Sequence, residues 1–103
     1  MIFGFKKIKK QLTFDLDTNE LKNEFGKGNY TKGYRLLKYF FDEKGFSRIQ
    51  SSVYNSNDKM SKPSMVFLLL DLKTKEPWVK TCLKKISITN IKGVSNFEKF
   101  LRL

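Results

Sequence analysis

Residues 11–17, QLTFDLD, alternate between apolar and polar side chains, and they constrain the fold more than any other stretch of this 103-residue chain. Leu12, Phe14 and Leu16 fall on one side of an extended segment, and the hydroxyl and carboxyl side chains between them fall on the other. A period of two is typical of a strand with one buried face. We therefore expect a first strand here, at the centre of one domain, because a chain of this length has little room for a second.

The two acids of this stretch differ in whether a structural role explains them. Asp17 is followed three residues later by Glu20, which is the spacing of a capping box and predicts a short helix over 18–25. Asp15 has no such role, and it lies inside a strand, where aspartate is disfavoured. Asp15 is therefore the better functional candidate, and the alternative is an ion pair with a neighbouring lysine or Arg48.

The remaining chain alternates between helical and strand patterns. It predicts a helix from Asn29 or Thr31 to about Lys44, then a strand over 47–55 and a helix over 63–75. A short helix begun at Pro77 and a strand over 86–91 follow. Ser95 and Glu98 open a last helix, which directs Phe97, Phe100 and Leu101 inward. The run MVFLLL at 65–70 would also fit a buried strand. This order predicts an α+β, ferredoxin-like sandwich, with helices on one face of a small antiparallel sheet. Residues 1–10 form a basic N-terminal extension to a single domain over 11–103.

Polar side chains of three expected strands would share the sheet face that the helices leave open. They are Thr13 and Asp15, then Gln50, Ser52 and Tyr54 with Arg48 at the start of their strand, then Ser87 and Thr89. This face would be rich in hydroxyl groups around one carboxylate. An open sheet face is also polar simply because water contacts it, so the pattern alone supports either a site or a solvated surface.

The charge of the chain indicates a polyanionic partner. Lysine and arginine total 21 against 10 aspartate and glutamate, a formal net charge of +11. Nucleic acid is the first expectation and an anionic membrane surface the second, and a merely solvated lysine-rich surface is the alternative. The start MIFGFKKIKK does not match a secretory signal, and the longest apolar run is too short to span a bilayer, so we expect a cytoplasmic protein.

Missing residue types restrict the chemistry. The chain has no histidine, which excludes Ser-His-Asp and Cys-His nucleophiles, His-paired ribonuclease sites and His-ligated metals. Cys82 is the single cysteine, so an intrachain disulfide and a cysteine zinc site are excluded as well. Any chemistry must use carboxylates, lysines, arginines, tyrosines, hydroxyl groups or a metal ion held by carboxylates.

Several segments in a fixed order resemble the virulence-associated protein D family. They are LTFDLDTNELK, then GYRLLKYFFDEKGFSRIQSSVY, then PWVKTCLKKISITNI. The family has a first strand ending in Phe-Asp-Leu, a Gly-Phe followed by Gln-Gly-Ser and an aromatic residue, and a tryptophan opening a short helix before the final strand. Here Gly45 and Phe46, then Gln50 and Ser52, then Trp78 stand at the corresponding positions. The resemblance covers roughly residues 11–103.

The resemblance implies a homodimeric endoribonuclease, the toxin of a toxin–antitoxin pair in several bacteria. It also implies a fold similar to the small CRISPR adaptation nucleases, with two protomers joined through their sheets. The family's first-strand aspartate falls on Asp15, which would be the catalytic residue, and the serine after Gln-Gly falls on Ser52. An antitoxin or another protein is then an expected partner.

We expect RNA to be cleaved in a basic cleft between two protomers. Asp15 would deprotonate a ribose 2′-hydroxyl, or two Asp15 side chains would hold one Mg²⁺, so the cofactor is either none or Mg²⁺. The expected RNA-binding residues, which hold phosphates or stack a base, are Lys10, Arg48, Gln50, Ser52 and Tyr54. Two alternatives stay open: a non-catalytic nucleic-acid-binding dimer, and a protein-interaction module that regulates a larger nucleoprotein complex.

Overall fold

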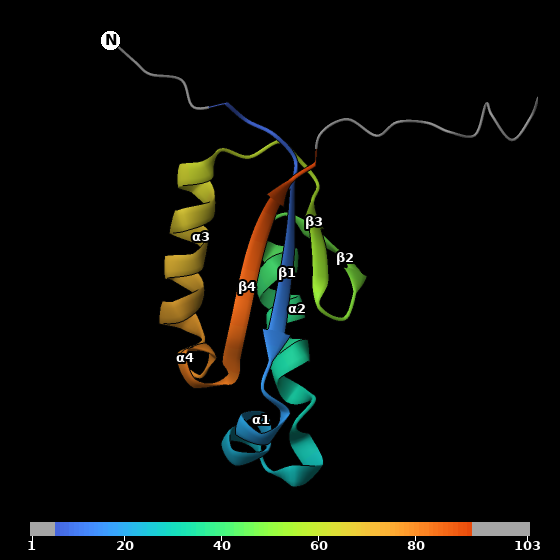
Figure 1. Cartoon of the computed structure of the whole chain (residues 1–103), viewed down its shortest axis with the longest axis vertical. Coiled ribbons are helices and arrows are strands. Elements are labelled where there is room, and N and C mark those ends of the chain that lie inside the picture. Colours follow the sequence, from blue (N-terminus) through green and yellow to red (C-terminus); the bar gives the residue numbers. More distant parts are fainter. Residues whose placement is uncertain (1–5, 92–103) are drawn as a thin grey trace, which may run out of the picture.

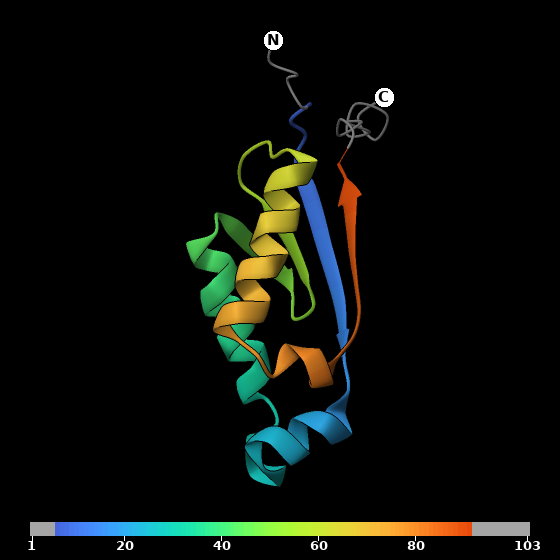
Figure 2. The ribbon, with the colours of Figure 1, turned by 90° about the vertical axis from the view of Figure 1, so that its left-hand side faces the viewer.

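The structure, a computed structural model, describes residues 6–91 and contains a four-stranded antiparallel sheet in the order β2-β3-β1-β4 (Figure 1). Its elements are β1 (Lys10–Leu16), α1 (Thr18–Phe25), the 3-10 turn η1 (Lys27–Asn29), α2 (Lys32–Glu43), β2 (Phe46–Gln50), β3 (Val53–Ser56), α3 (Lys62–Lys75), α4 (Val79–Cys82) and β4 (Leu83–Asn90). Helices α2 and α3 lie on one face of the sheet (Figure 2). The expected α+β, ferredoxin-like architecture is confirmed, since strands and helices follow the β-α-β-β-α-β order.

Strand β1 occupies the centre of the sheet and alternates as its sequence predicts. Leu12, Phe14 and Leu16 are buried beneath the helices, while Thr13 is partly exposed and Asp15 is exposed on the other face. The strand begins at Lys10, and an isolated bridge between Ile8 and Met60 continues the pairing beyond it. Part of the expected N-terminal extension therefore belongs to the folded domain.

The predicted N-cap after β1 forms, but only one of the two hydrogen bonds of a capping box is present, because the backbone N–H of Asp17 donates to the carbonyl of Cys82 and not to Glu20. Asp17 has extended backbone angles, and its Oδ1 accepts a hydrogen bond of 3.1 Å from the backbone N–H of Glu20. This contact satisfies one of the N–H groups that have no partner inside the helix. Helix α1 ends at Gly26, whose φ of 94° is a conformation that side chains disfavour.

Helix α2 carries the expected apolar stripe, with Leu37, Phe40 and Phe41 buried. Gly33 is buried in the same helix, although glycine costs helix stability of about 1 kcal/mol relative to alanine. Packing explains it: a Cβ at Gly33 would lie 2.8 Å from Leu21 Cδ2 and 3.1 Å from the ring of Trp78. The glycine therefore lets α1 and the start of α4 approach α2 closely.

The single strand expected over 47–55 is wrong. This segment is a hairpin of β2 and β3, with a turn at Ser51 and Ser52. The register also shifts between Arg48 and Gln50, so an uninterrupted period of two does not run through the segment. Both features change which side chains face the helices.

Helix α3 resolves the ambiguity of MVFLLL in favour of a helix. It begins after Ser61, whose Oγ accepts a hydrogen bond of 3.3 Å from the N–H of Ser64, and Pro63 stands in its first turn as expected. Strand β4 starts at Leu83, three residues before the predicted start. The helix expected from Ser95 lies outside the described residues. Within residues 6–91, no helix has both the length and the apolarity needed to cross a membrane.

The core between sheet and helices is built around aromatic rings. Phe41 of α2 packs against Phe14, Phe46 and Tyr54, with ring centroids 4.9–6.2 Å apart. Cys82 is also fully buried, and burial raises the pKa of its thiol, so the inert character expected of this cysteine agrees with its position.

Candidate active site on the open face of the sheet

Asp15 lies near the end of β1, on the sheet face opposite the helices, and its side chain is exposed. Its cross-strand partner is Lys85 of β4, and the next pair on the same face is Thr13 with Ser87. Side chains directly opposite in an antiparallel pair have Cβ atoms about 5 Å apart. One carboxylate therefore stands beside one ammonium group and two hydroxyl groups on an accessible surface.

The sheet is irregular at this position. Asp15 pairs with Lys85, but the next residue, Leu16, pairs with Leu83, so Lys84 is an extra residue in β4. Such a bulge bends its strand, increases the local twist and changes the direction of nearby side chains. Lys84 and Lys85 are both exposed, and Lys85 is the direct cross-strand neighbour of Asp15.

The Asp15 carboxylate has no ion-pair partner within 4 Å among residues 6–91, where the salt bridges use only Asp42 and Asp71. The ion pair considered as the alternative for Asp15 is therefore not formed within this part of the chain. Asp17 differs, because its carboxylate caps α1 and its N–H donates to the carbonyl of Cys82 at 2.8 Å. Asp17 thus has a structural role in the described part of the chain, and Asp15 has none there.

Gln50 and Ser52 remain close to this face. Gln50 is exposed and pairs with Val53, which in turn pairs with Thr13. Ser52 lies in the turn of the hairpin, and its backbone carbonyl accepts a hydrogen bond of 3.1 Å from the N–H of Phe14. Its side chain is partly exposed.

Tyr54 and Arg48 do not lie on the open face, so their expected placement there is wrong. Tyr54 is fully buried among the aromatic rings of the core and has no surface on which a base could stack. Arg48 pairs with Tyr54 and lines a small pocket with Thr31 and Tyr34 on the side of α2. Arg48 and Tyr54 are a cross-strand pair and therefore share one face, which the buried Tyr54 identifies as the helix face. The register shift between Arg48 and Gln50 puts Gln50 on the other face.

Lys10 is also distant from Asp15. Asp15 is five positions further along β1, which is roughly 17 Å along a strand. Lys10 is 5% exposed, its backbone N–H donates to Ser56 Oγ at 2.8 Å, and its Nζ donates to Asn90 Oδ1. The structure therefore does not gather this expected RNA-binding residue with the others.

The described residues provide few ligands for a metal ion at this site. Among residues 6–91, no three acidic or cysteine side chains gather around one point. Mg²⁺ in proteins is usually held by one or two carboxylates together with substrate phosphates. Asp15 provides one carboxylate per chain, so the expected pair of Asp15 side chains around one Mg²⁺ would have to come from two chains.

Lys84 and Lys85 are the site residues that sequence reasoning missed. Alternation counted backwards from Ser87 and Thr89 would have placed Lys85 on the open face, but the strand was expected to begin at Ile86. Gln11 was missed as well; its Nε2 donates to Asn55 Oδ1 at 2.9 Å across the same face.

No family model matches the sequence. The chain is 32% identical over 80 residues to Endoribonuclease VapD 2 of Riemerella anatipestifer, and the match covers 78% of this chain and 85% of that protein.

Proposed function

The chain belongs to the virulence-associated protein D family, and we propose that it is an endoribonuclease whose catalytic residue is Asp15. The relative's name supports the substrate class. The observation that carries the assignment is the exposed Asp15 carboxylate, which stands beside Lys85 at a bulge in the sheet and has no ion-pair partner in the described part of the chain.

Asp15 acts as a general base. Its carboxylate takes the proton of a ribose 2′-hydroxyl, the 2′-oxygen attacks the adjacent phosphorus, and the bond from phosphorus to the 5′-oxygen breaks. The products are a 2′,3′-cyclic phosphate and a 5′-hydroxyl. Lys84 and Lys85 stabilise the added negative charge at phosphorus, since cations placed where charge develops lower the barrier.

The leaving 5′-oxygen needs a proton. The chain has no histidine, so a lysine ammonium or water supplies it. Either is a poorly matched acid at neutral pH compared with imidazole, and we therefore expect slow turnover.

Replacement of Asp15 by asparagine tests the assignment. Asp15→Asn keeps the size of the side chain but removes the base, and we expect cleavage of a fluorescent RNA to fall at least about a hundredfold. Asp17→Asn is the matched control, because asparagine caps a helix as well as aspartate does and should leave cleavage unchanged. Undiminished cleavage by Asp15→Asn, in a protein with wild-type circular dichroism, would remove Asp15 from the reaction.

The phosphate groups at the ends of the RNA products test whether the 2′-oxygen attacks the phosphorus. A 2′,3′-cyclic phosphate, detected by mass spectrometry and formed in EDTA, supports attack by the 2′-oxygen. A 5′-phosphate product, or complete loss of cleavage in EDTA, would replace this route with a metal-assisted one.

We also propose that two chains pair through their sheets, which would bring two sites into one basic cleft. Light scattering should give twice the chain mass of 12.2 kDa. A fully exchanged equal mixture of wild type and Asp15→Asn should keep about half of the activity if each Asp15 acts alone, and about a quarter if both are needed together. We expect about half.

A role as the toxin of a toxin–antitoxin pair follows from RNA cleavage in the producing cell. Induced expression of the wild type should slow bacterial growth, and Asp15→Asn at the same protein level should not. Equal growth arrest by both would assign any toxicity to something other than cleavage.

A further inference from the structure

Helix α3 is apolar on nearly all sides, although only one side is covered. Met65, Leu68 and Leu72 lie in the core. The outward-facing side chains are also large and apolar: Val66 is 50% exposed, Phe67 70% and Leu70 52%. A helix that is apolar all round is normally buried all round, so this outer face fits a partner better than water.

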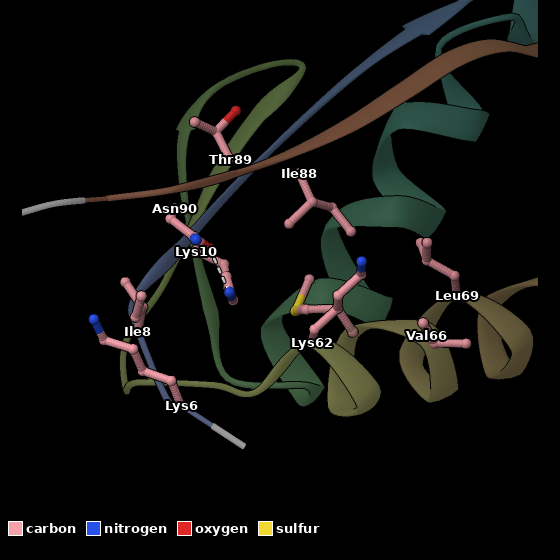
Figure 3. Close-up of a pocket in the computed structure, with 10 residues that line it drawn as sticks. Lys6, Ile8, Lys10, Lys62, Val66, Leu69, Ile88, Thr89 and Asn90 are labelled. Atoms are coloured by element: carbon pink, nitrogen blue, oxygen red, sulfur yellow. Dashed lines mark hydrogen bonds between the residues drawn. The ribbon is translucent and has the colours of Figure 1, made fainter.

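A groove continues from this face. It lies between α3 and the end of β4, has a volume of about 660 Å³, and is lined by apolar side chains from three segments (Figure 3). These are Ile8, Met65, Val66, Leu69 and Ile88. Val66 belongs to both the exposed face and the groove, so the two are continuous. Together they form one apolar surface that is large enough for several side chains of a partner.

Three lysines border the same groove: Lys6, Lys10 and Lys62 (Figure 3). Among residues 6–91, no acidic residue lines the groove, and the Nζ of the buried Lys10 donates to a neutral amide, Asn90. An ammonium group removed from water is stabilised by an anion.

The acid that α3 itself carries is already engaged. Asp71 lies 2.5 Å from Lys44 Nζ and 3.5 Å from Lys75 Nζ, on the side of the helix that borders a different pocket with Met60 and Phe67. Within the described part of the chain, the positive charge of the three groove lysines is therefore not balanced by an acidic side chain.

We propose that α3 and the groove beside it bind an acidic amphipathic helix of a partner protein. Its apolar side chains would pack on Val66, Phe67 and Leu70, and its carboxylates would meet Lys6, Lys10 and Lys62. Charge selects this occupant over a second copy, because an isologous contact would bring the same three lysines of that copy to this surface. The surface belongs to the helical side of the sheet, opposite Asp15, so the proposal does not depend on RNA cleavage.

Two synthetic peptides of about 18 residues test the surface. Both carry leucines at helical spacing, one with glutamates elsewhere and the other with lysines. We expect fluorescence anisotropy to show binding of the acidic peptide only. Leu70→Glu and Lys62→Glu should each weaken this binding by roughly tenfold or more. Tyr39→Glu, at a 67% exposed aromatic residue of α2, is the matched control and should not.

Four outcomes would overturn the proposal. The acidic peptide fails to bind, or it binds equally to wild type and to Lys62→Glu, an exposed position whose change should not affect folding. Leu70→Glu, with wild-type circular dichroism, converts a dimer into monomers, which would assign the face to a second copy. A photo-crosslinking residue at position 70 links to residues 92–103 of its own chain, which would assign it to that segment.

Discussion

Gly33 is the residue at which close packing overrides helix propensity. A methyl group at this position would overlap Leu21 Cδ2 and press on the Trp78 ring, and both side chains are buried. We expect Gly33→Ala to lower the free energy of unfolding, because overpacking costs about 1–3 kcal/mol while the gain in propensity is about 1 kcal/mol. Thermal unfolding measures the difference.

Gly28→Ala is the control for Gly33→Ala. A Cβ at Gly28 meets nothing within 4 Å, and its φ is not in the left-handed region. This variant should match or exceed the wild type in stability. A Gly33→Ala variant that is as stable as Gly28→Ala would contradict the close approach of α1 and α4 to α2.

The buried Tyr54 phenol makes the fold less stable at alkaline pH. Burial raises the pKa of its phenol, the Arg48 cation lowers it by less, and Asp42 adds to the increase. The unfolded chain releases this proton at about pH 10, while the folded chain retains it to higher pH. Above about pH 10 the unfolded state therefore binds fewer protons, and stability falls as pH rises toward the folded pKa.

Tyr54→Phe should remove this fall. It should also raise stability at pH 7 by about 1 kcal/mol, since the buried hydroxyl has no hydrogen-bond partner among residues 6–91. Urea unfolding of both proteins at pH 7 and at about pH 10.5 measures the two effects. Equal losses of stability in the two proteins would exclude Tyr54 as the source.

At the level of elements, the bulge in β4 determines how Asp15 is presented. Deletion of Lys84 would let Leu83 and Lys85 pair with Leu16 and Asp15 without an extra residue, so the strand would straighten. We expect RNA cleavage to fall at least about tenfold while the fold persists, because a small misplacement of a catalytic group is costly. Lys84→Ala keeps the bulge and should retain more activity than the deletion. Equal activity in the two variants would show that the bulge is not needed.

Patterns among residues that are close in the sequence predicted an element correctly where the pattern fits only one type of secondary structure. The alternation of Leu12, Phe14 and Leu16 identified β1, and the capping box of Asp17 identified α1, because each depends on residues that are neighbours in the chain. The exposed position of Asp15 followed from the same alternation. The role of Gly33 could not be predicted, since it depends on Leu21 and Trp78, which only the tertiary fold brings to it.

The hairpin of β2 and β3 shows where local reasoning fails. SRIQSSVY contains serines but no glycine or proline to indicate a turn, and the prediction of one regular strand put Arg48 and Tyr54 on the wrong face. Lys85 was missed for a different reason, because the strand was expected to begin at Ile86, although Lys85 continues the alternation of Ser87.

At the scale of the whole molecule, lysines gather on two separate surfaces. Lys85 pairs with Asp15 and follows the exposed Lys84 of the bulge, while Lys6, Lys10 and Lys62 line the groove beside α3. One basic surface suits a phosphate backbone, which offers charge without apolar contacts. The other combines charge with exposed apolar side chains and suits an acidic helix. A single chain could therefore bind RNA and a protein at the same time.

The salt dependence of RNA affinity tests whether RNA binds at the open sheet face. Each phosphate contact with single-stranded RNA contributes about 0.7 to the slope of log affinity against log salt. Loss of both lysines in Lys84→Ala/Lys85→Ala should therefore reduce this slope by about 1.4. Lys59→Ala/Lys73→Ala removes two exposed lysines away from the open face and should leave the slope unchanged. Asp15→Asn is the suitable background, because it prevents cleavage during titration. Equal reductions in both double variants would mean that RNA binds the chain by diffuse charge and that the open sheet face is not its site.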